Sequence, residues 1–507
     1  MQMNANLRTL AMALFGLFLF KVGLAALLPI TGDEAYFVQW GRHLDYGYYD
    51  HPPMAGWMVW FQLLLSDHLV WLRMPAILTE LAISLLLYWI ARPYGENRAV
   101  LLALIYALSP LMLINVMILT DTGSILFGAL SFALTVRGLQ TGRMAWFAAA
   151  GAALGLAFLS KYFAVLLGLG YFIYFFVIDR SRWRQGLLLL GCVLPFVALN
   201  LAWNATHCWT NILFNLVNRH AGGGEKGGPG SLLAYLGMLV LFITPWLLKD
   251  LWRTRRTPLS EALRLARVLA LTGLAAFGLL SWGKNIGLHW VLWLYPMILL
   301  PAVLLPEDRL RRQLRYFSLF SLALVVLLAV VLAVPLSTWA KHDKYGKSVV
   351  LGFRGQDVVT AFDRASGGLP LASTGYTASG MLAFHAGRDV MVLGPGSKYA
   401  RMDDFWTDLR DYHGRDIAIY FKNDGDIEKL KPYFETTRVV TVPVAGVNFR
   451  LLVGQRFDYP SYRRDILTQV RARYYDLPAW LPNYGCGFLE KYFPDRGASV
   501  HSNKACV

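Results

Sequence analysis

Charged residues are scarce in this chain, and cysteine is scarcer still. Only 16% of the 507 residues are Asp, Glu, Lys or Arg, whereas 56% are hydrophobic and recur in long runs with almost no charge. Such runs exclude an ordinary soluble domain and indicate a polytopic membrane protein. The 4 cysteines form no CxxC and no Cys/His spacing, which argues against a zinc site. If a disulfide forms, we expect it to join Cys486 and Cys506.

Acidic residues are outnumbered, with 32 Asp and Glu against 48 Lys and Arg and a formal net charge of +16. A basic surplus gathered into one patch is typical of nucleic-acid-binding proteins. Here the basic residues are scattered over many short loops. Membrane topology explains that pattern better, and we expect no nucleic-acid partner.

The first apolar run, from Leu10 to Ile30, is too long for a signal peptide and lacks a small-residue cleavage site. We interpret it as a retained transmembrane helix, in which Lys21 either snorkels to the surface or faces a polar cavity. Further runs lie near residues 71–91, 99–114, 122–136, 145–159, 162–178, 186–203, 232–248, 268–282, 287–305 and 316–336. Together they predict an all-α membrane domain with about 11 transmembrane helices, within a range of roughly 11–13.

Basic residues return at every second connection, a pattern that predicts a cytoplasmic N-terminus. From about Ser337 the long runs stop, and stretches such as "DVMVL" and "DIAIYF" predict a small α/β domain outside the cytoplasm. We therefore predict a membrane domain over 1–336 and a periplasmic domain over 337–507. A glycine-rich loop at 221–230, bordered by Arg219 and His220, is either a substrate gate or a plain connector.

The first outer segment, "ITGDEAYFVQWGRHLDYGYYDHPP", is unusually polar for this chain. Thr31 and Glu34 fit a capping box, so a helix starts here. Apolar residues on one face of that helix, Phe37, Trp40 and Leu44, suit an amphipathic juxtamembrane helix. The adjacent acids Asp33 and Glu34 either complement the helix dipole or present carboxylates at the membrane boundary.

The "GYYDHPP" turn that follows has two interpretations as well. Tyr48 and Tyr49 are either interfacial aromatics or substrate contacts. Asp50 and His51 are either turn residues or part of a substrate site.

These stretches, with "LTDTGSILFGALSFAL", "LGLAFLSKYFAVLL" and "KNIGLHWVLWLYP", resemble membrane glycosyltransferases of the GT-C class. The chain is similar to bacterial relatives of the dolichyl-phosphate-mannose protein mannosyltransferases, including lipid A aminoarabinose transferases and lipopolysaccharide-core galacturonosyltransferases. The resemblance covers roughly residues 7–310. It implies inverting transfer of a hexose or pentose from an undecaprenyl-phosphate type of carrier to a glycolipid or glycan outside the cytoplasm.

The resemblance implies that Asp33 is the general base that deprotonates the acceptor hydroxyl, with Glu34 assisting it or holding a metal. Adjacent helical residues point about 100° apart, so separate roles are more natural than a shared proton. For the leaving phosphate, the resemblance favours Lys161, which is otherwise an interfacial loop lysine. Arg73 and Lys284 are further candidates, although Arg73 alternatively anchors its helix.

Asp121 is either a helix N-cap or a carboxylate that faces the substrate. Asn285 and His289, one turn apart on an expected helix, could bind phosphate, sugar hydroxyls or a divalent ion. A metal held by Glu34, Asp121 and His289 is one option, against a packed interfacial histidine. His220 joins the candidate substrate contacts.

Three other functions stay open at this point. A protein O-glycosyltransferase would share the same machinery. A lipid or sugar transporter would show paired repeats with polar residues at mid-membrane, whereas here they gather on one face. A receptor or assembly platform would not need acids, lysine and histidine at one surface.

Overall fold

Each of the apolar runs is helical over most of its length in the computed structural model, which describes residues 5–219, 228–342, 344–478, 480–482 and 484–494. Among these residues, 6 helices are long and apolar enough to cross a membrane, or 7 if one bent pair counts as a single span. Shorter apolar helices cover Met144–Phe158, Ala164–Ile178 and Leu288–Leu304. The chain is a multi-pass membrane protein, and the larger span count stays a prediction.

The chain divides into two compact units. Met1–Leu28, Ser66–Leu199 and Gly223–Val330 form the first, called here the helical unit. Pro29–Leu65, Asn200–Gly222 and Val331–Val507 form the second, called here the mixed unit. The mixed unit therefore includes two internal segments and the last six residues of the range 1–336, which the sequence had suggested as one membrane domain.

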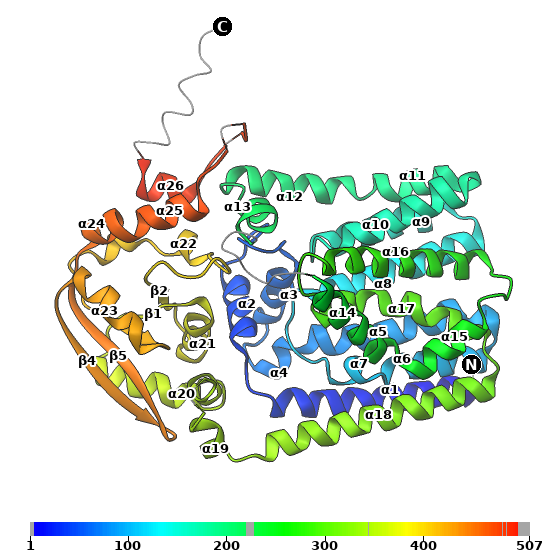
Figure 1. Ribbon diagram of the computed structural model, residues 1–507, viewed down its shortest axis with the longest axis horizontal. Coiled ribbons are helices and arrows are strands. Elements are labelled where there is room, and N and C mark those ends of the chain that lie inside the picture. The colour runs from blue at the N-terminus through cyan, green and yellow to red at the C-terminus, as the bar shows by residue number, and fades with distance from the viewer. Residues whose placement is uncertain (1–4, 220–227, 343, 479, 483, 495–507) are drawn as a thin grey trace, which may run out of the picture. The chain divides into compact units, whose positions relative to one another are not determined.

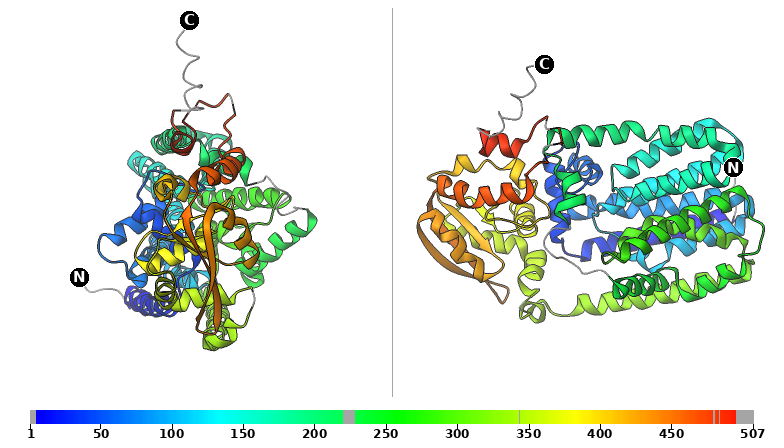
Figure 2. Two further views of the ribbon diagram at one scale, coloured as in Figure 1. Left: turned by 90° about the vertical axis from the view of Figure 1, so that its left-hand side faces the viewer. Right: turned by 45° about the horizontal axis from the view of Figure 1, so that its top comes forward.

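The longer helices of the helical unit run side by side, and shorter ones lie between them (Figures 1 and 2). They are α1 (Ala5–Leu27), α4 (Leu69–Leu72), α5 (Met74–Ala91), α6 (Glu96–Ala107), α7 (Pro110–Ile114), α8 (Asp121–Thr141), α9 (Met144–Phe158), α10 (Ala164–Phe172), α11 (Trp183–Gly191), α12 (Leu194–Thr206), α14 (Pro229–Ile243), α15 (Pro245–Arg253), α16 (Glu261–Ser281), α17 (Tyr295–Leu299) and α18 (Glu307–Ala333), with short 3-10 or π segments η2 (Ile173–Ile178), η5 (Leu288–Leu294) and η6 (Leu300–Leu304). Small residues let them approach closely: a Cβ on Gly151 of α9 would lie 2.1 Å from the Leu189 carbonyl oxygen of α11.

The mixed unit carries a 5-stranded sheet in the order β2-β1-β3-β5-β4. Its strands are β1 (Leu371–Ser373), β2 (Met391–Val392), β3 (Ile417–Phe421), β4 (Phe434–Val444) and β5 (Val447–Phe457). The first three are parallel, and β5 runs antiparallel to both β3 and β4. Ala445 and Gly446, both at positive φ, form the tight turn of the β4–β5 hairpin. The predicted small α/β domain is present.

The mixed unit also contains helices, which lie beside this sheet and make up part of the first outer segment (Figure 1). They are α2 (Gly32–Arg42), α3 (Met54–Leu63), α13 (Thr210–Leu213), α19 (Leu336–Ala340), α20 (Gly346–Ser366), α21 (Tyr376–Ala386), α22 (Asp403–Trp406), α23 (Ile427–Leu430), α24 (Tyr459–Tyr462), α25 (Thr468–Tyr474) and α26 (Gly487–Tyr492), with η4 (Phe214–Asn218) and η7 (Leu409–Tyr412) between them. Phe362 of α20 packs on Tyr420 and Phe449 of the sheet.

Two glycines bring α2 against α21. A Cβ on Gly32 would lie 2.7 Å from the Cβ of Thr377, and one on Gly380 would lie 3.0 Å from the backbone nitrogen of Tyr36. Any larger side chain would force the helices apart. The helix that bears the candidate base is thus held by the C-terminal α/β fold.

On the face of α2 expected to be apolar, Phe37 and Trp40 are 9% and 0% exposed, whereas Leu44, just after the helix, is 46% exposed. The juxtamembrane position of this helix stays a prediction. One expectation is corrected here. Cys486 bonds to Cys208, not to Cys506, which lies outside the described residues. The backbones already meet there: the Cys208 N–H donates to the Gly485 carbonyl at 3.2 Å.

Candidate active site

Asp33 lies in the first turn of α2, and its side chain is exposed. The Tyr376 hydroxyl donates to its Oδ1 at 3.3 Å. Crowding by protein atoms desolvates the carboxyl group and raises the pKa of Asp33; the Tyr376 hydrogen bond opposes this rise, and the Asp50 charge adds to it. An accessible carboxylate with a raised pKa is suited to take a proton from a hydroxyl group.

Glu34 has a different environment. It is fully buried, and its Oε2 accepts hydrogen bonds from the Thr31 backbone N–H at 3.1 Å and the Thr31 hydroxyl at 3.2 Å. The capping box predicted from the sequence is present. Glu34 therefore secures the start of the helix that presents Asp33, which fits the separate roles expected for the two acids.

The "GYYDHPP" turn is buried in the mixed unit. Tyr48 and Tyr49 are both 0% exposed, which excludes the interfacial position considered for them. Tyr48 stacks on Trp40 with ring centroids 4.3 Å apart and donates to the Trp40 carbonyl at 2.8 Å. The stacked rings of Tyr48 and Trp40 pack in the buried interior beside the turn.

Asp50, the acidic residue of this turn, is only 7% exposed. Its Oδ2 accepts the backbone N–H of Ala400 at 3.1 Å, and its Oδ1 lies 3.2 Å from Nδ1 of His51. Asp50 and His51 both act electrostatically on Asp33, in opposite directions. The structure thus gathers Asp33, Asp50 and His51 in one unit.

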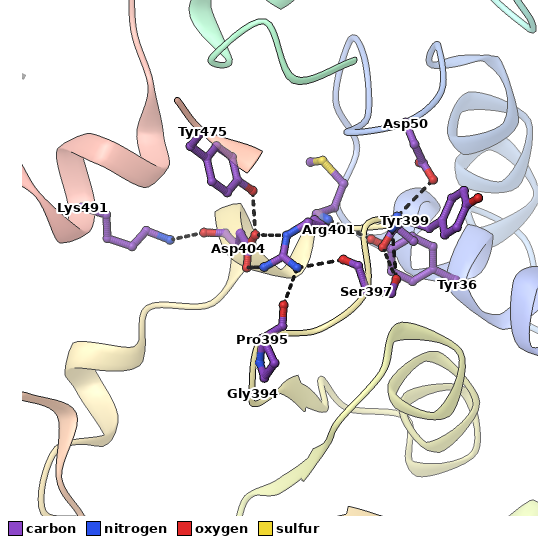
Figure 3. Close-up of polar contacts among 12 residues, drawn as sticks. Tyr36, Asp50, Gly394, Pro395, Ser397, Tyr399, Arg401, Asp404, Tyr475 and Lys491 are labelled. Atoms are coloured by element: carbon purple, nitrogen blue, oxygen red, sulfur yellow. Dashed lines mark hydrogen bonds and ion pairs between the residues drawn. The ribbon is translucent and has the colours of Figure 1, made fainter. Parts of the chain in front are cut away.

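Ala400 belongs to a loop, residues 394–402, whose role in the site the sequence did not reveal (Figure 3). Arg401, 6% exposed, donates to the Pro395 and Ser397 carbonyls, both at 2.8 Å, and pairs with Asp404 at 2.8 Å. This buried guanidinium folds the loop on itself and so aims the Ala400 N–H at Asp50. The sequence signal for this loop was the pair of glycines in "GPGS", because glycine permits tight turns. Gly394 and Gly396 both adopt a positive φ in the structure.

A second polar cluster lies in the helical unit. Lys161 Nζ donates to Asp121 Oδ1 at 2.6 Å, with only 12% and 4% of the two side chains exposed. Lys161 and Lys284 both lie over the Trp290 ring, at 6.0 and 5.3 Å from its centroid. Two cations therefore lie near one aromatic ring, a suitable arrangement for binding a phosphate group.

Other predicted residues have other environments. Asn285 lies in a non-helical segment before η5, so the expected shared helical face with His289 is wrong, and both side chains are exposed. Arg73 is fully buried and donates to the Ala25 and Leu28 carbonyls at 2.7 and 2.8 Å, which favours the anchoring alternative. His220 lies outside the described residues.

Lys21 does not snorkel. It is fully buried and donates to the Met112 and Asn115 carbonyls, and Glu80, a residue missed in the sequence, accepts from Tyr106 and Asn115 close by. The sequence signal for a role of Glu80 was its position as an acidic residue inside the apolar run 71–91.

The divalent metal considered from the resemblance stays a prediction. Within the described ranges, no group of three or more His, Cys, Asp and Glu side chains could hold an ion. Glu34 is engaged in its cap and Asp121 in an ion pair, so neither offers a free set of oxygens.

Residues 50–203 match the model of the dolichyl-phosphate-mannose-protein mannosyltransferase family. The lipid A galacturonosyltransferase RgtD of Rhizobium johnstonii is 31% identical over 187 residues, which are 36% of this chain and 39% of that protein. The match thus spans about two fifths of that relative.

Two solved structures are similar in fold to nearly the whole of this chain. ArnT from Cupriavidus metallidurans in its apo state has a TM-score of 0.66 at 16% identity, covering 90% of this chain and 99% of ArnT. ArnT bound to undecaprenyl phosphate gives 0.64 at 17% identity, covering 87% and 97%. The expected mostly helical fold with a small C-terminal sheet is confirmed. The expected resemblance to relatives of the dolichyl-phosphate-mannose protein mannosyltransferases, among them a lipid A-modifying enzyme, is confirmed as well.

Proposed function

We propose that the protein is an inverting glycosyltransferase that moves a sugar from a polyprenyl-phosphate carrier to lipid A, lipopolysaccharide or another envelope glycan. The observation that carries this proposal is Asp33, an accessible carboxylate of raised pKa at the start of α2, in a chain with the ArnT fold.

In this reaction Asp33 takes the proton from an acceptor hydroxyl group. The freed oxygen forms a bond to the anomeric carbon of the sugar, while the bond from that carbon to the carrier phosphate breaks. The phosphate oxygen leaves with the electron pair. Lys161 and Lys284 are the groups proposed to neutralise that charge.

The carrier class is supported by the relatives, since ArnT is solved with undecaprenyl phosphate and RgtD acts on lipid A. The proposed periplasmic location of the mixed unit is supported by its Cys208–Cys486 disulfide, because such bonds persist in oxidising compartments. The positive-inside pattern of the loops agrees with it.

The test is mass spectrometry of envelope lipids and glycans from cells with the wild-type protein, without it, or with Asp33→Asn at equal expression. Loss of one defined sugar in both the null strain and the variant supports the proposal and identifies the product. Asp45→Asn, in the same segment but paired with His207, serves as the matched control and should keep the sugar.

Other outcomes would count against the proposal. A sugar lost only in the null strain would exclude Asp33 as the base. A sugar missing from proteins, with glycolipids intact, would indicate a protein O-glycosyltransferase. An unchanged set of glycans would favour a transporter or a platform.

A further inference from the structure

A groove of about 380 Å³ lies between α15, α16 and α17 of the helical unit. Its wall is mostly apolar, with Leu251 from α15, Leu274 from α16 and Met297 from α17. Two arginines, Arg255 and Arg267, also line it. An apolar wall with fixed positive charges matches an acyl chain joined to an anionic head group.

A fixed break in the chain shapes this groove. α14 and α15 meet at 79°, and Thr244 between them has a φ of 68° and is 1% exposed. A β-branched residue in this conformation is strained, and such strain clusters at functional positions. Ile243, just before the break, and Leu248, after it, both line the groove.

The two arginines are placed for a phosphate group. Arg255 lies over the Trp252 ring at 4.3 Å and donates to the Trp252 carbonyl at 2.9 Å, so its aliphatic stem and head group have a fixed position. Trp252 lines the same groove and is 67% exposed. Exposed tryptophan beside arginine is typical of the level of lipid head groups. Arg267 on α16 is half-buried, and it supplies the second charge.

This groove is separate from the lysine cluster of the same unit. Arg267 lies 14 residues before Ser281, the last residue of α16, which corresponds to about 21 Å along the helix. Lys284 follows beyond that end. The two basic sites therefore lie toward opposite ends of α16.

We propose that the groove binds one anionic diacyl phospholipid, with its acyl chains on the apolar wall and its phosphodiester between Arg255 and Arg267. This binding does not depend on the proposed transferase activity.

The test uses the full-length protein, purified in detergent, stripped of lipid and titrated with dioleoyl phosphatidylglycerol or dioleoyl phosphatidylcholine in native mass spectrometry. We expect the wild type to retain phosphatidylglycerol about tenfold more strongly, because the choline ammonium of phosphatidylcholine is repelled by the two arginines, whereas phosphatidylglycerol carries a net negative charge. R255Q/R267Q should lose this preference. The matched control R256Q/R264Q removes the same charge from exposed positions outside the groove and should keep it.

Leu274→Trp fills the groove without changing charge and should weaken binding of both lipids, which keeps the proposal testable if the arginine variant fails to fold. Equal losses in both arginine variants would overturn the proposal, since they would reflect general charge attraction. Equal retention of the two lipids by the wild type would overturn it as well. Displacement of phosphatidylglycerol by an equimolar polyprenyl phosphate would assign the groove to the carrier instead.

Discussion

The Asp50 carboxylate accepts a 3.1 Å hydrogen bond from the backbone N–H of Ala400, although 350 positions separate the two residues in the chain. Ala400 has a φ of 53°, which an L-residue seldom adopts without support from its surroundings. The buried Arg401 supplies that support. The turn next to the candidate base is thus held by a loop of the C-terminal α/β fold.

Asp50→Asn should move the acid limb of the pH–activity profile to lower pH. The Asp50 charge contributes to the raised pKa of Asp33, and the base is lost when pH falls through that pKa. An amide still accepts the Ala400 N–H, so the loop stays in place. Asp45→Asn is the control and should leave the limb unchanged; an equal shift in both variants would contradict the prediction.

Asp33→Asn should lower transfer about 100-fold or more without lowering the melting temperature. The fold disfavours the charged carboxylate, so at neutral pH ionised Asp33 costs stability, and the neutral amide removes that cost. The difference in melting temperature from the wild type should vanish as pH falls below the ordinary pKa of aspartate. Thermal unfolding measured beside lipid transfer checks this; a melting temperature well below that of the wild type would refute it.

Arg401→Gln should destabilise the mixed unit by about 2–3 kcal/mol, because the change leaves the largely buried Asp404 carboxylate without its cation. Limited proteolysis in detergent at rising urea concentration would measure this. Arg410, whose pair with Asp408 is more exposed, is the matched control, and Arg410→Gln should change little. Similar protease resistance of the two variants would show that Arg401 does not hold the loop.

Lys161→Met should weaken binding of polyprenyl phosphate about tenfold, and Lys161→Met/Asp121→Asn should not restore it. The double variant removes the carboxylate that Lys161 neutralises, so it should recover the stability that the single variant loses. Binding by fluorescence or native mass spectrometry, beside thermal unfolding, separates the two effects. Recovery of binding in the double variant would limit Lys161 to a structural role.

Cys208→Ser should lower the free energy of unfolding by about 2–5 kcal/mol, because the bond spans 278 positions. Non-reducing peptide mapping should find the Cys208 and Cys486 peptides linked. The half-buried Cys192 is the control position, and Cys192→Ser should have little effect. A Cys486–Cys506 linkage in the map would overturn the assignment.

Several features were determined by the sequence alone because they depend on short-range physics. Apolar runs of about 20 residues fold as helices wherever water is absent, since each backbone group must then be paired within its own segment. The Thr31–Glu34 capping box closes over four residues and formed as predicted. The alternating stretches near the C-terminus likewise became strands.

Only the tertiary structure decided which distant groups meet. Asp50 with Ala400, Cys208 with Cys486, and Lys161 with Asp121 are each chosen by how whole elements pack, and no local pattern encodes such a pairing. Burial was decided in the same way: Trp40, suited to a membrane surface by its periodicity, is 0% exposed and stacks on Tyr48. Chemistry at a position follows from residue type, whereas its environment follows from the fold.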